Sequence, residues 1–270
     1  MQTCRPESKL RDFKVSPLAV APRFPAWQFR SYQEFSNFLK DHQSILDSRH
    51  LYQLTLAVRK ERLEQPGSCA PCRRPVVFTS DVNGEKLSDG KRMPNWREEL
   101  HCNCPWRLNN RQRAVLHLAQ ASGLRGWASS LLLGEPSDFA LAYMANALNT
   151  RMLPRFHITD GAVTLPVESG SCHFVISQDD LQKVGPLASA LAEMARVLVP
   201  GGRLIFTVPF HAAEVSLPCG PDLPVGGRRF GWNLLDMLKA AGFTDAVALL
   251  YWSEELGYLG NMNFVFLAMK

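Results

Sequence analysis

The chain has 270 residues, of which 46% are hydrophobic and 20% are charged, so it can bury a sizeable core in one large domain with an appendage or in two small domains. No apolar run reaches the roughly 18–20 residues that cross a bilayer, and the polar start MQTCRPESKLRDFK differs from a secretory signal, which predicts a cytoplasmic protein without a membrane partner. The net charge of +5 comes from the first 110 residues; it predicts a solvated surface, and nucleic-acid binding through those residues is the weaker alternative.

Residues 1–65 are predicted to form an N-terminal helical segment. The first 25 residues are interrupted by prolines, which favours irregular structure. Between Ser31 and Glu64, apolar residues recur at spacings of three and four, which predicts two helices with a break near 47–50. Pro66 and Gly67 then mark the end of this segment.

Residues 66–110 are predicted to form a small metal-binding insertion, because four of the seven cysteines gather there. The pair Cys69 and Cys72 has the spacing of one half of a zinc ribbon, and Cys102 and Cys104 form a second pair that is tighter than usual. Four thiolates suit a tetrahedral, structural Zn²⁺, and the adjacent His101 is an alternative fourth ligand. The competing interpretation is four reduced thiols in a poorly packed loop.

The segment NWREELHCNCPWRLNNRQRA within and after this insertion combines Trp96, Trp106 and four arginines. Aromatic and Arg residues together can bind phosphate, nucleic acid or a protein partner. The simpler prediction is that the two tryptophans pack the insertion against the large domain.

Residues 111–270 alternate between strand and helix patterns. This alternation predicts an α/β domain with a mostly parallel sheet that is covered by helices on both faces. Strands are expected at 128–134, 155–160, 172–178, 201–210, 245–253 and 262–270, and helices at 109–122, 137–148, 186–198 and 231–243.

The segment LASALAEMARVLVPGGRLIFTVPF, at 187–210, ends a helix and turns through Pro200, Gly201 and Gly202 into a buried strand. The residue pattern of this segment resembles the corresponding segment of class I S-adenosylmethionine-dependent methyltransferases. The predicted helix and two strands at 231–270 resemble the end of the same fold. The upstream CAPC, NWREELHCNC and LNNRQRA resemble a bacterial group of such proteins with a zinc-binding segment before the catalytic fold. The resemblance implies a Rossmann-type, seven-stranded, mostly parallel sheet whose last strand inserts antiparallel beside the sixth.

In that family the cofactor lies across the carboxyl ends of the strands. The resemblance implies that Asp160 hydrogen-bonds the adenine amine of the cofactor. It also implies that Gln178, at the end of its strand, lies near the sulfonium. The turn GEPSDFA stands at the place of the usual glycine-rich loop but has one glycine, and no acidic residue stands at the expected ribose position before Asp160. The candidate cofactor-binding residues of this turn are Gly134, Glu135, Ser137 and Asp138; the helix N-terminus there has free N–H groups for the cofactor carboxylate, and Glu135 could face its ammonium group.

The candidate catalytic residues are Asp179, His211 and Glu214, which follow strand ends where an acceptor would lie. Methyl transfer needs in-line positioning, and a general base helps when the acceptor must lose a proton. Each residue has a structural alternative: Asp179 as a helix cap, His211 as a loop histidine and Glu214 as a solvated charge. His173, within an apolar strand, is predicted to be a packed or hydrogen-bonded core residue.

Two functions of different classes follow from these residues. The first is S-adenosylmethionine-dependent methyl transfer to an unidentified small or carrier-bound acceptor. The second is a catalytically silent methyltransferase-like module that binds a protein partner, which the missing glycines and ribose carboxylate favour. Cofactor binding distinguishes the two.

Overall fold

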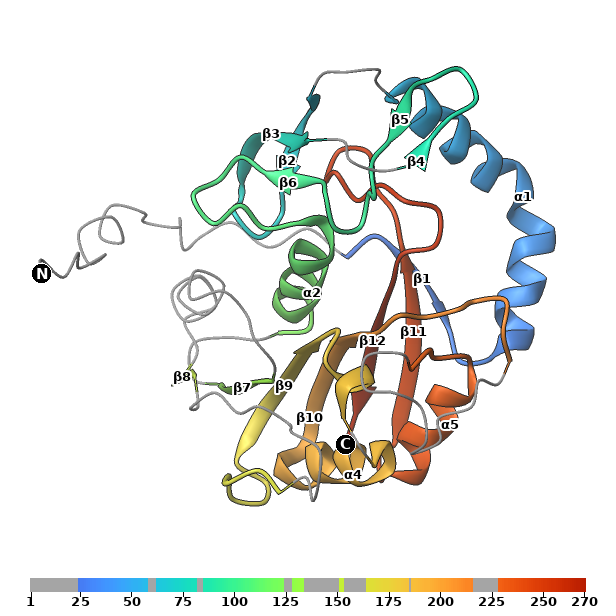
Figure 1. The fold of residues 1–270 in the computed structure, drawn as a ribbon. Helices are drawn as coiled ribbons and strands as arrows, with labels where there is room; N and C mark the ends of the chain where they lie inside the picture. The colour runs from blue at the N-terminus through green and yellow to red at the C-terminus, as the bar shows by residue number, and fades with distance from the viewer. Residues whose placement is uncertain are drawn as a thin grey trace, which may run out of the picture.

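The computed structural model describes residues 24–57, 62–81, 85–123, 128–133, 151–152, 164–184, 186–215 and 228–270. A central sheet carries the long helix α1 along one side, two small sheets above it and the helices α4 and α5 below it (Figure 1). In chain order the elements are β1 (Ala26–Phe29), α1 (Tyr32–Thr55), β2 (Leu63–Cys69), β3 (Arg74–Ser80), β4 (Glu85–Lys86), β5 (Arg92–Met93), β6 (His101–Cys102), α2 (Asn110–Ala121), β7 (Ser129–Leu133), β8 (Arg151–Met152), β9 (Cys172–Gln178), the 3-10 helix η1 (Leu181–Lys183), α4 (Leu187–Val197), β10 (Leu198–Thr207), α5 (Asn233–Ala240), β11 (Asp245–Tyr251) and β12 (Phe264–Met269).

The central sheet has the strand order β1-β11-β12-β10-β9-β7-β8. Strands β10, β9, β7 and β8 are parallel neighbours, and β12 lies antiparallel between β10 and β11. The expected antiparallel insertion of the last strand is therefore present. Among the described residues, the chain from 111 onward supplies six of the strands, and the strand expected at 155–160 lies outside them.

The seventh strand of the sheet is β1, which the sequence pattern did not predict. It pairs antiparallel with β11, from Ala26 opposite Tyr251 to Phe29 opposite Ala248. The following α1 consists of two helical stretches joined across a kink, as predicted. The kink lies at His42, with φ −121° and ψ 15°, which is earlier than the predicted 47–50. The start of α1 is fixed by Ser31, whose hydroxyl accepts a hydrogen bond from the amide of Glu34.

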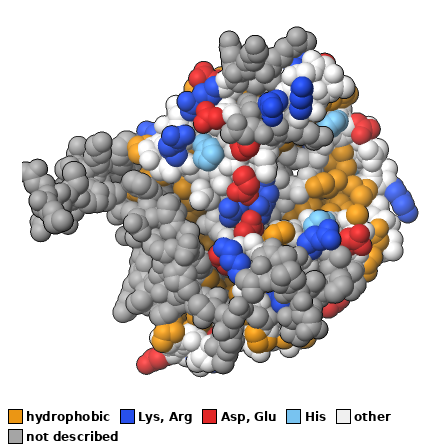
Figure 2. All heavy atoms as spheres, viewed as in Figure 1, with side chains coloured by type: hydrophobic (Ala, Val, Ile, Leu, Met, Phe, Trp, Pro, Cys, Tyr) orange, Lys and Arg blue, Asp and Glu red, His pale blue; other side chains and the backbone are white. Residues whose placement is uncertain are grey.

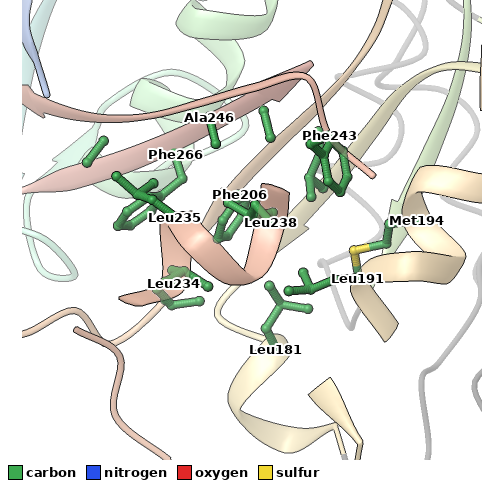
Figure 3. Packing of buried hydrophobic residues seen from close by; sticks show 14 of the residues in the cluster. Leu181, Leu191, Met194, Phe206, Leu234, Leu235, Leu238, Phe243, Ala246 and Phe266 are labelled. Carbon is green, nitrogen blue, oxygen red and sulfur yellow. The ribbon is translucent and has the colours of Figure 1, made fainter. Parts of the chain in front are cut away.

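Helices cover both faces of the sheet, as predicted. On one face, Phe206 and Phe266 pack with leucines of α5 and with Leu191 and Met194 of α4 (Figure 3). On the other face, α2 packs through Leu116 and its neighbours against the opposite side of the same strands. Burial of this apolar area, at about 25 cal/mol per Å², is the main stabilising contribution to the fold.

The Pro-Gly-Gly turn lies within β10 as an irregularity that shifts its register with β9 between Leu198 and Arg203. Gly201 has φ +76°, where a side chain is strained. A Cβ on Gly202 would lie 2.8 Å from the carbonyl oxygen of Val199. The turn therefore needs both glycines for local geometry.

The cysteine-rich insertion is more ordered than its loop-like sequence suggested. Strands β2, β3 and β6 form one small sheet, and β4 and β5 form a second. Phe78, Leu100 and Trp96 form a small core there with Leu259 of the large domain, and Trp106 packs against it. The packing role expected of the two tryptophans is thus observed. No described helix is both long and apolar enough to span a membrane.

Candidate functional site

The carboxyl ends of β7 and β9 border a pocket of about 330 Å³. Parallel strands bring their carboxyl ends to one edge of a sheet, and this edge is where open α/β sheets bind ligands. Positively and negatively charged side chains lie together in the middle of the molecular surface that Figure 2 shows. The pocket is lined by Arg111, Gln112, Leu132, Leu133, Gln178, Asp179, Asp180, Gln182 and Lys183.

Asp179 follows directly after β9 and is held in an unusual backbone conformation. Its φ is +55°, a left-handed value that is uncommon for a residue with a side chain, and its amide donates to the carbonyl oxygen of Thr207 at 3.0 Å. The Asp179 carboxylate accepts two hydrogen bonds from Arg97, at 2.7 and 2.6 Å. Arg111 approaches the same carboxylate to 3.4 Å.

Asp179 is mostly buried, with 18% of its side chain exposed. Burial alone would raise the pKa of its carboxyl, but the hydrogen bonds and charges of Arg97, with the charge of Arg111, outweigh burial and lower that pKa. Burial likewise opposes the charge of Arg97, and the hydrogen bonds to Asp179 prevail and raise the Arg97 pKa. Asp179 is therefore a paired carboxylate at neutral pH.

Glu98 extends this group of charges. Its carboxylate accepts hydrogen bonds from Arg111 at 2.9 and 3.0 Å and from the Asn109 amide at 3.0 Å. Asn109 is also the N-cap of α2, in a reciprocal capping box with Gln112. We call Arg97, Glu98, Arg111 and Asp179 the ion-pair cluster. It connects the cysteine-rich insertion, α2 and the end of β9.

The structure describes one of the six predicted cofactor-binding residues. Gln178 ends β9, lines the pocket and accepts a hydrogen bond from Arg111 at 3.4 Å. The other five, Gly134, Glu135, Ser137, Asp138 and Asp160, lie outside the described residues.

The three predicted catalytic residues are not brought together in the pocket. Asp179 lines it, whereas His211 and Glu214 lie in the segment after β10 and are not among the lining residues. There the amide of Glu214 donates to the carbonyl oxygen of His211 at 3.0 Å, and Glu214 is exposed. His173 accepts a hydrogen bond from the amide of Ser129 at 3.2 Å, in agreement with its predicted structural role.

The sequence pattern gave no reason to place Arg97, Glu98 or Arg111 in this site. Arg97 and Asp179 are 82 residues apart, and no local pattern relates them. The one signal was the concentration of arginines around Trp96 and Trp106, which indicated binding without naming a target.

The cysteines of the insertion form a buried cluster. The sulfur atoms of Cys69, Cys72 and Cys102 all lie within 4.8 Å of one another. The amide of Cys104 donates to the sulfur of Cys102 at 3.3 Å, and the Cys104 thiol contacts those of Cys102 and Cys72. Among the described residues, His101 is not part of the close group; its Nδ1 lies 2.8 Å from the carbonyl oxygen of Glu99.

The thiols of this cluster shift one another's protonation. Hydrogen bonds with Cys102 and then Cys72 lower the pKa of Cys69 well below its usual range, and the bonds with its neighbours raise the pKa of Cys72. Likewise, the bond with Cys104 lowers the pKa of Cys102, and the same bond raises that of Cys104. Two of the four thiols therefore have lowered pKa values and two have raised ones.

Arg113 of α2 lies beside the cysteine cluster with its side chain fully buried. Its guanidinium donates to the carbonyl oxygens of Leu256 and Gly257, both at 2.9 Å, and lies 4.0 Å from the ring centroid of Phe78. Within the described part of the chain no carboxylate pairs with it. A buried cation without a carboxylate favours an anionic neighbour, and the cysteine cluster is the available one.

Comparison with known proteins supports the fold. Residues 119–206, which are 88 of the 270, match a family described as Methyltransferase domain. No curated protein matches the chain. A S-adenosylmethionine-dependent methyltransferase from Aquifex aeolicus is 14% identical over 57% of this chain and 88% of that chain, with a TM-score of 0.42.

Two further solved structures show comparable similarity. The [4+2]-cyclase SpnF is 19% identical over 59% of this chain and 80% of that chain, with a TM-score of 0.41. Phosphoethanolamine N-methyltransferase 2 from Haemonchus contortus, in complex with phosphomonomethylethanolamine and S-adenosylhomocysteine, is 14% identical over 60% of this chain and 53% of that chain, with a TM-score of 0.40. The family match and the strand order together assign a class I methyltransferase fold with a mixed central sheet.

Proposed function

We propose that this protein binds S-adenosylmethionine in the pocket at the carboxyl ends of β7 and β9 and transfers its methyl group to a small or carrier-bound acceptor. The observation that carries the proposal is the position of this pocket, at the carboxyl ends of the strands within the region that matches the methyltransferase family. The acceptor itself is not identified by these residues.

The pocket lining suits the methionine end of the cofactor, which carries an ammonium and a carboxylate group. Arg111 and Lys183 supply positive charge, and Asp179 and Asp180 supply negative charge. Burial raises the pKa of Asp180, although its bond with Lys183 opposes this. Gln178 adds a side chain that can both donate and accept. The remaining contacts are proposed for Gly134, Glu135, Ser137, Asp138 and Asp160.

Bound there, the cofactor would supply an electrophilic methyl group. The ion-pair cluster would fix the end of β9 beside it, because Asp179 is held by two guanidinium groups. A carboxylate with a lowered pKa is a weak base, so we assign Asp179 a positioning role in place of the predicted catalytic one. His211 and Glu214 remain the proposed groups for removing a proton from the acceptor, if one must leave.

We further propose one structural Zn²⁺ held by Cys69, Cys72, Cys102 and Cys104. Three of these cysteines are buried and Cys72 is half-buried. The sulfurs of Cys69, Cys72 and Cys102 lie within 4.8 Å of one another, and the Cys104 thiol contacts two of them, an arrangement that suits tetrahedral coordination. A zinc ion with four thiolates carries a net charge of −2, which the buried guanidinium of Arg113 would partly balance. Reduced, metal-binding cysteines also fit the predicted cytoplasmic location.

A silent module that binds a protein partner is the second candidate. Two features favour it: the Asp179 carboxylate is already paired with Arg97, and the turn at 134–140 has one glycine where a glycine-rich loop is usual. Titration with S-adenosylhomocysteine tests the two functions. We expect Gln178→Ala to weaken binding about tenfold and Gln43→Ala, an exposed change on α1, to leave it unchanged. Equal affinities of both variants would contradict the proposed pocket.

Binding of nucleic acid by the basic first 110 residues is the weakest alternative. It predicts an affinity that falls steeply as salt rises, because phosphate contacts release counterions. A gel-shift series at increasing salt tests it, and no binding at low salt would exclude it.

A further inference from the structure

The second half of α1 carries an arginine held between two tryptophans. The guanidinium carbon of Arg49 lies 4.1 Å from the ring centroid of Trp27 and 4.5 Å from that of Trp252. Trp27 belongs to β1, and Trp252 directly follows β11. Three separate elements therefore hold this one guanidinium group in place, which restricts its rotamers before any ligand binds.

Within the described part of the chain, the N–H donors of Arg49 have ring contacts but no hydrogen-bond acceptor. A guanidinium has five N–H donors that require oxygen acceptors, and no described residue accepts a hydrogen bond from Arg49 or forms an ion pair with it. Burial lowers the pKa of Arg49 to about 10, with no charge that opposes this. Arg30, just before the start of α1, by contrast donates to Asp245 at 2.9 Å.

This arginine lies at the functional edge of the sheet. Strand β11 runs in the same direction as β10 and β9, because β12 is antiparallel to both β10 and β11. The end of β11, next to Trp252, is therefore on the same edge as the pocket at the end of β9. Three strand spacings of about 4.8 Å separate β9 from β11, which gives a lateral distance of about 14 Å.

A hydrophobic area lies on this face between α1 and the central charged side chains (Figure 2). Partly buried apolar residues of this side of the core include Trp27, Leu39 and Phe210. A ligand that reached from the pocket toward Arg49 would thus cross apolar surface and end at a cation.

We propose that Arg49, framed by Trp27 and Trp252, is a binding site for an oxyanion, a phosphate or carboxylate group on a ligand. The planar fork of a guanidinium binds such groups through two parallel hydrogen bonds, and partial burial strengthens them. Resting on the proposed function, the ligand is the methyl acceptor, an elongated molecule whose anionic group binds Arg49 while its reactive atom lies near the pocket.

Arg49 also has a purely structural interpretation, in which it fastens α1 to β1 and β11. That role would change the melting temperature of Arg49 variants but would give no response to anions. The test therefore uses the zinc-replete full chain with inorganic phosphate as the probe, in the absence of cofactor. Failure of cofactor binding and failure of this site are then seen separately.

Tryptophan fluorescence and thermal unfolding are followed as phosphate replaces chloride at constant ionic strength. We expect a saturable fluorescence change and a higher melting temperature in phosphate, with Arg49→Gln weakening phosphate binding at least about tenfold. Arg30→Gln removes an arginine that is already paired with Asp245 and is expected to titrate like the wild type. Equal responses to phosphate and chloride, or an unchanged titration of Arg49→Gln, would overturn the proposal.

If Arg49→Gln does not fold, the Arg49→Lys variant tests the proposed anion-binding site instead. Lysine keeps the charge and the aliphatic stem but lacks the planar fork. Binding weakened about tenfold, with a melting temperature in chloride close to that of the wild type, supports the site; wild-type binding overturns it. Repeating the titration with acetate tells a carboxylate-binding site from one that prefers phosphate.

Discussion

The pair formed by Arg97 and Asp179 tests whether the cysteine-rich insertion is part of the functional site. Replacement of Arg97 by Met removes the two hydrogen bonds of 2.7 and 2.6 Å and keeps most of the side-chain volume. Asp179 then retains Arg111 at 3.4 Å as its cation. We expect the variant to be less stable and to hold the end of β9 less firmly.

The magnitude follows from burial. Breaking a fully buried ion pair costs about 3–5 kcal/mol, but here 23% of the Arg97 side chain and 18% of the Asp179 side chain are exposed. With this exposure and the remaining Arg111, we expect Arg97→Met to lower the free energy of unfolding by about 2 kcal/mol. In a double-mutant cycle with Asp179→Asn, the coupling between the two residues should be about 1–2 kcal/mol.

Urea unfolding at neutral pH, followed by far-UV circular dichroism in the presence of zinc, measures all four proteins of the cycle. The exposed pair of Arg30 and Asp245, whose side chains are 49% and 40% exposed, is the matched control, with a coupling of about 0–1 kcal/mol. Additive effects of Arg97→Met and Asp179→Asn, with no coupling beyond that of the control, would refute the reasoning.

Other predictions concern the insertion and the cofactor. Gly257→Ala should lower the free energy of unfolding by about 2–4 kcal/mol in urea melts, because Gly257 has φ +61° and an added Cβ would overlap the Phe78 ring; unchanged stability would show that the two segments do not touch. Elemental analysis should find about one zinc per chain, and Cys72→Ser should lose it; metal-free protein that folds normally would remove the zinc proposal. Arg113→Met should weaken zinc binding about tenfold in a chelator competition, and unaltered affinity would mean that its charge is balanced elsewhere. Asp160→Ala should abolish cofactor binding in calorimetry, and a wild-type affinity would show that the strand alignment is wrong.

The sheet was predictable where an apolar run is bounded by turn-forming residues. The expected strand at 172–178 coincides with β9, and the one at 245–253 contains β11. β1 could not be found in this way, because its four residues, AWQF, follow a proline-rich stretch and gain their structure from pairing with β11. The strand conformation of β1 therefore depends on its pairing with β11 and not on local propensity.

Only those site residues that end or directly follow a predicted strand could be proposed from the sequence. Asp179 was proposed because it follows the end of a strand, where an acceptor would lie, and Gln178 because the family resemblance places the cofactor at that strand end. The partners of Asp179 were not found, since Arg97 lies in a different part of the chain and meets it only in the folded protein. The sequence shows which residues are charged, but only the folded structure shows which of them form ion pairs. Because Asp179 is paired with Arg97, we propose that it positions the end of β9 and does not act as a base.

Calorimetric titration of the zinc-replete protein with S-adenosylmethionine tests the central claim most directly. We expect micromolar binding in one class of site, with S-adenosylhomocysteine competing for it. No heat of binding at millimolar cofactor, from protein shown to be folded and zinc-loaded, would contradict the proposed methyl transfer and leave the partner-binding module as the function to pursue.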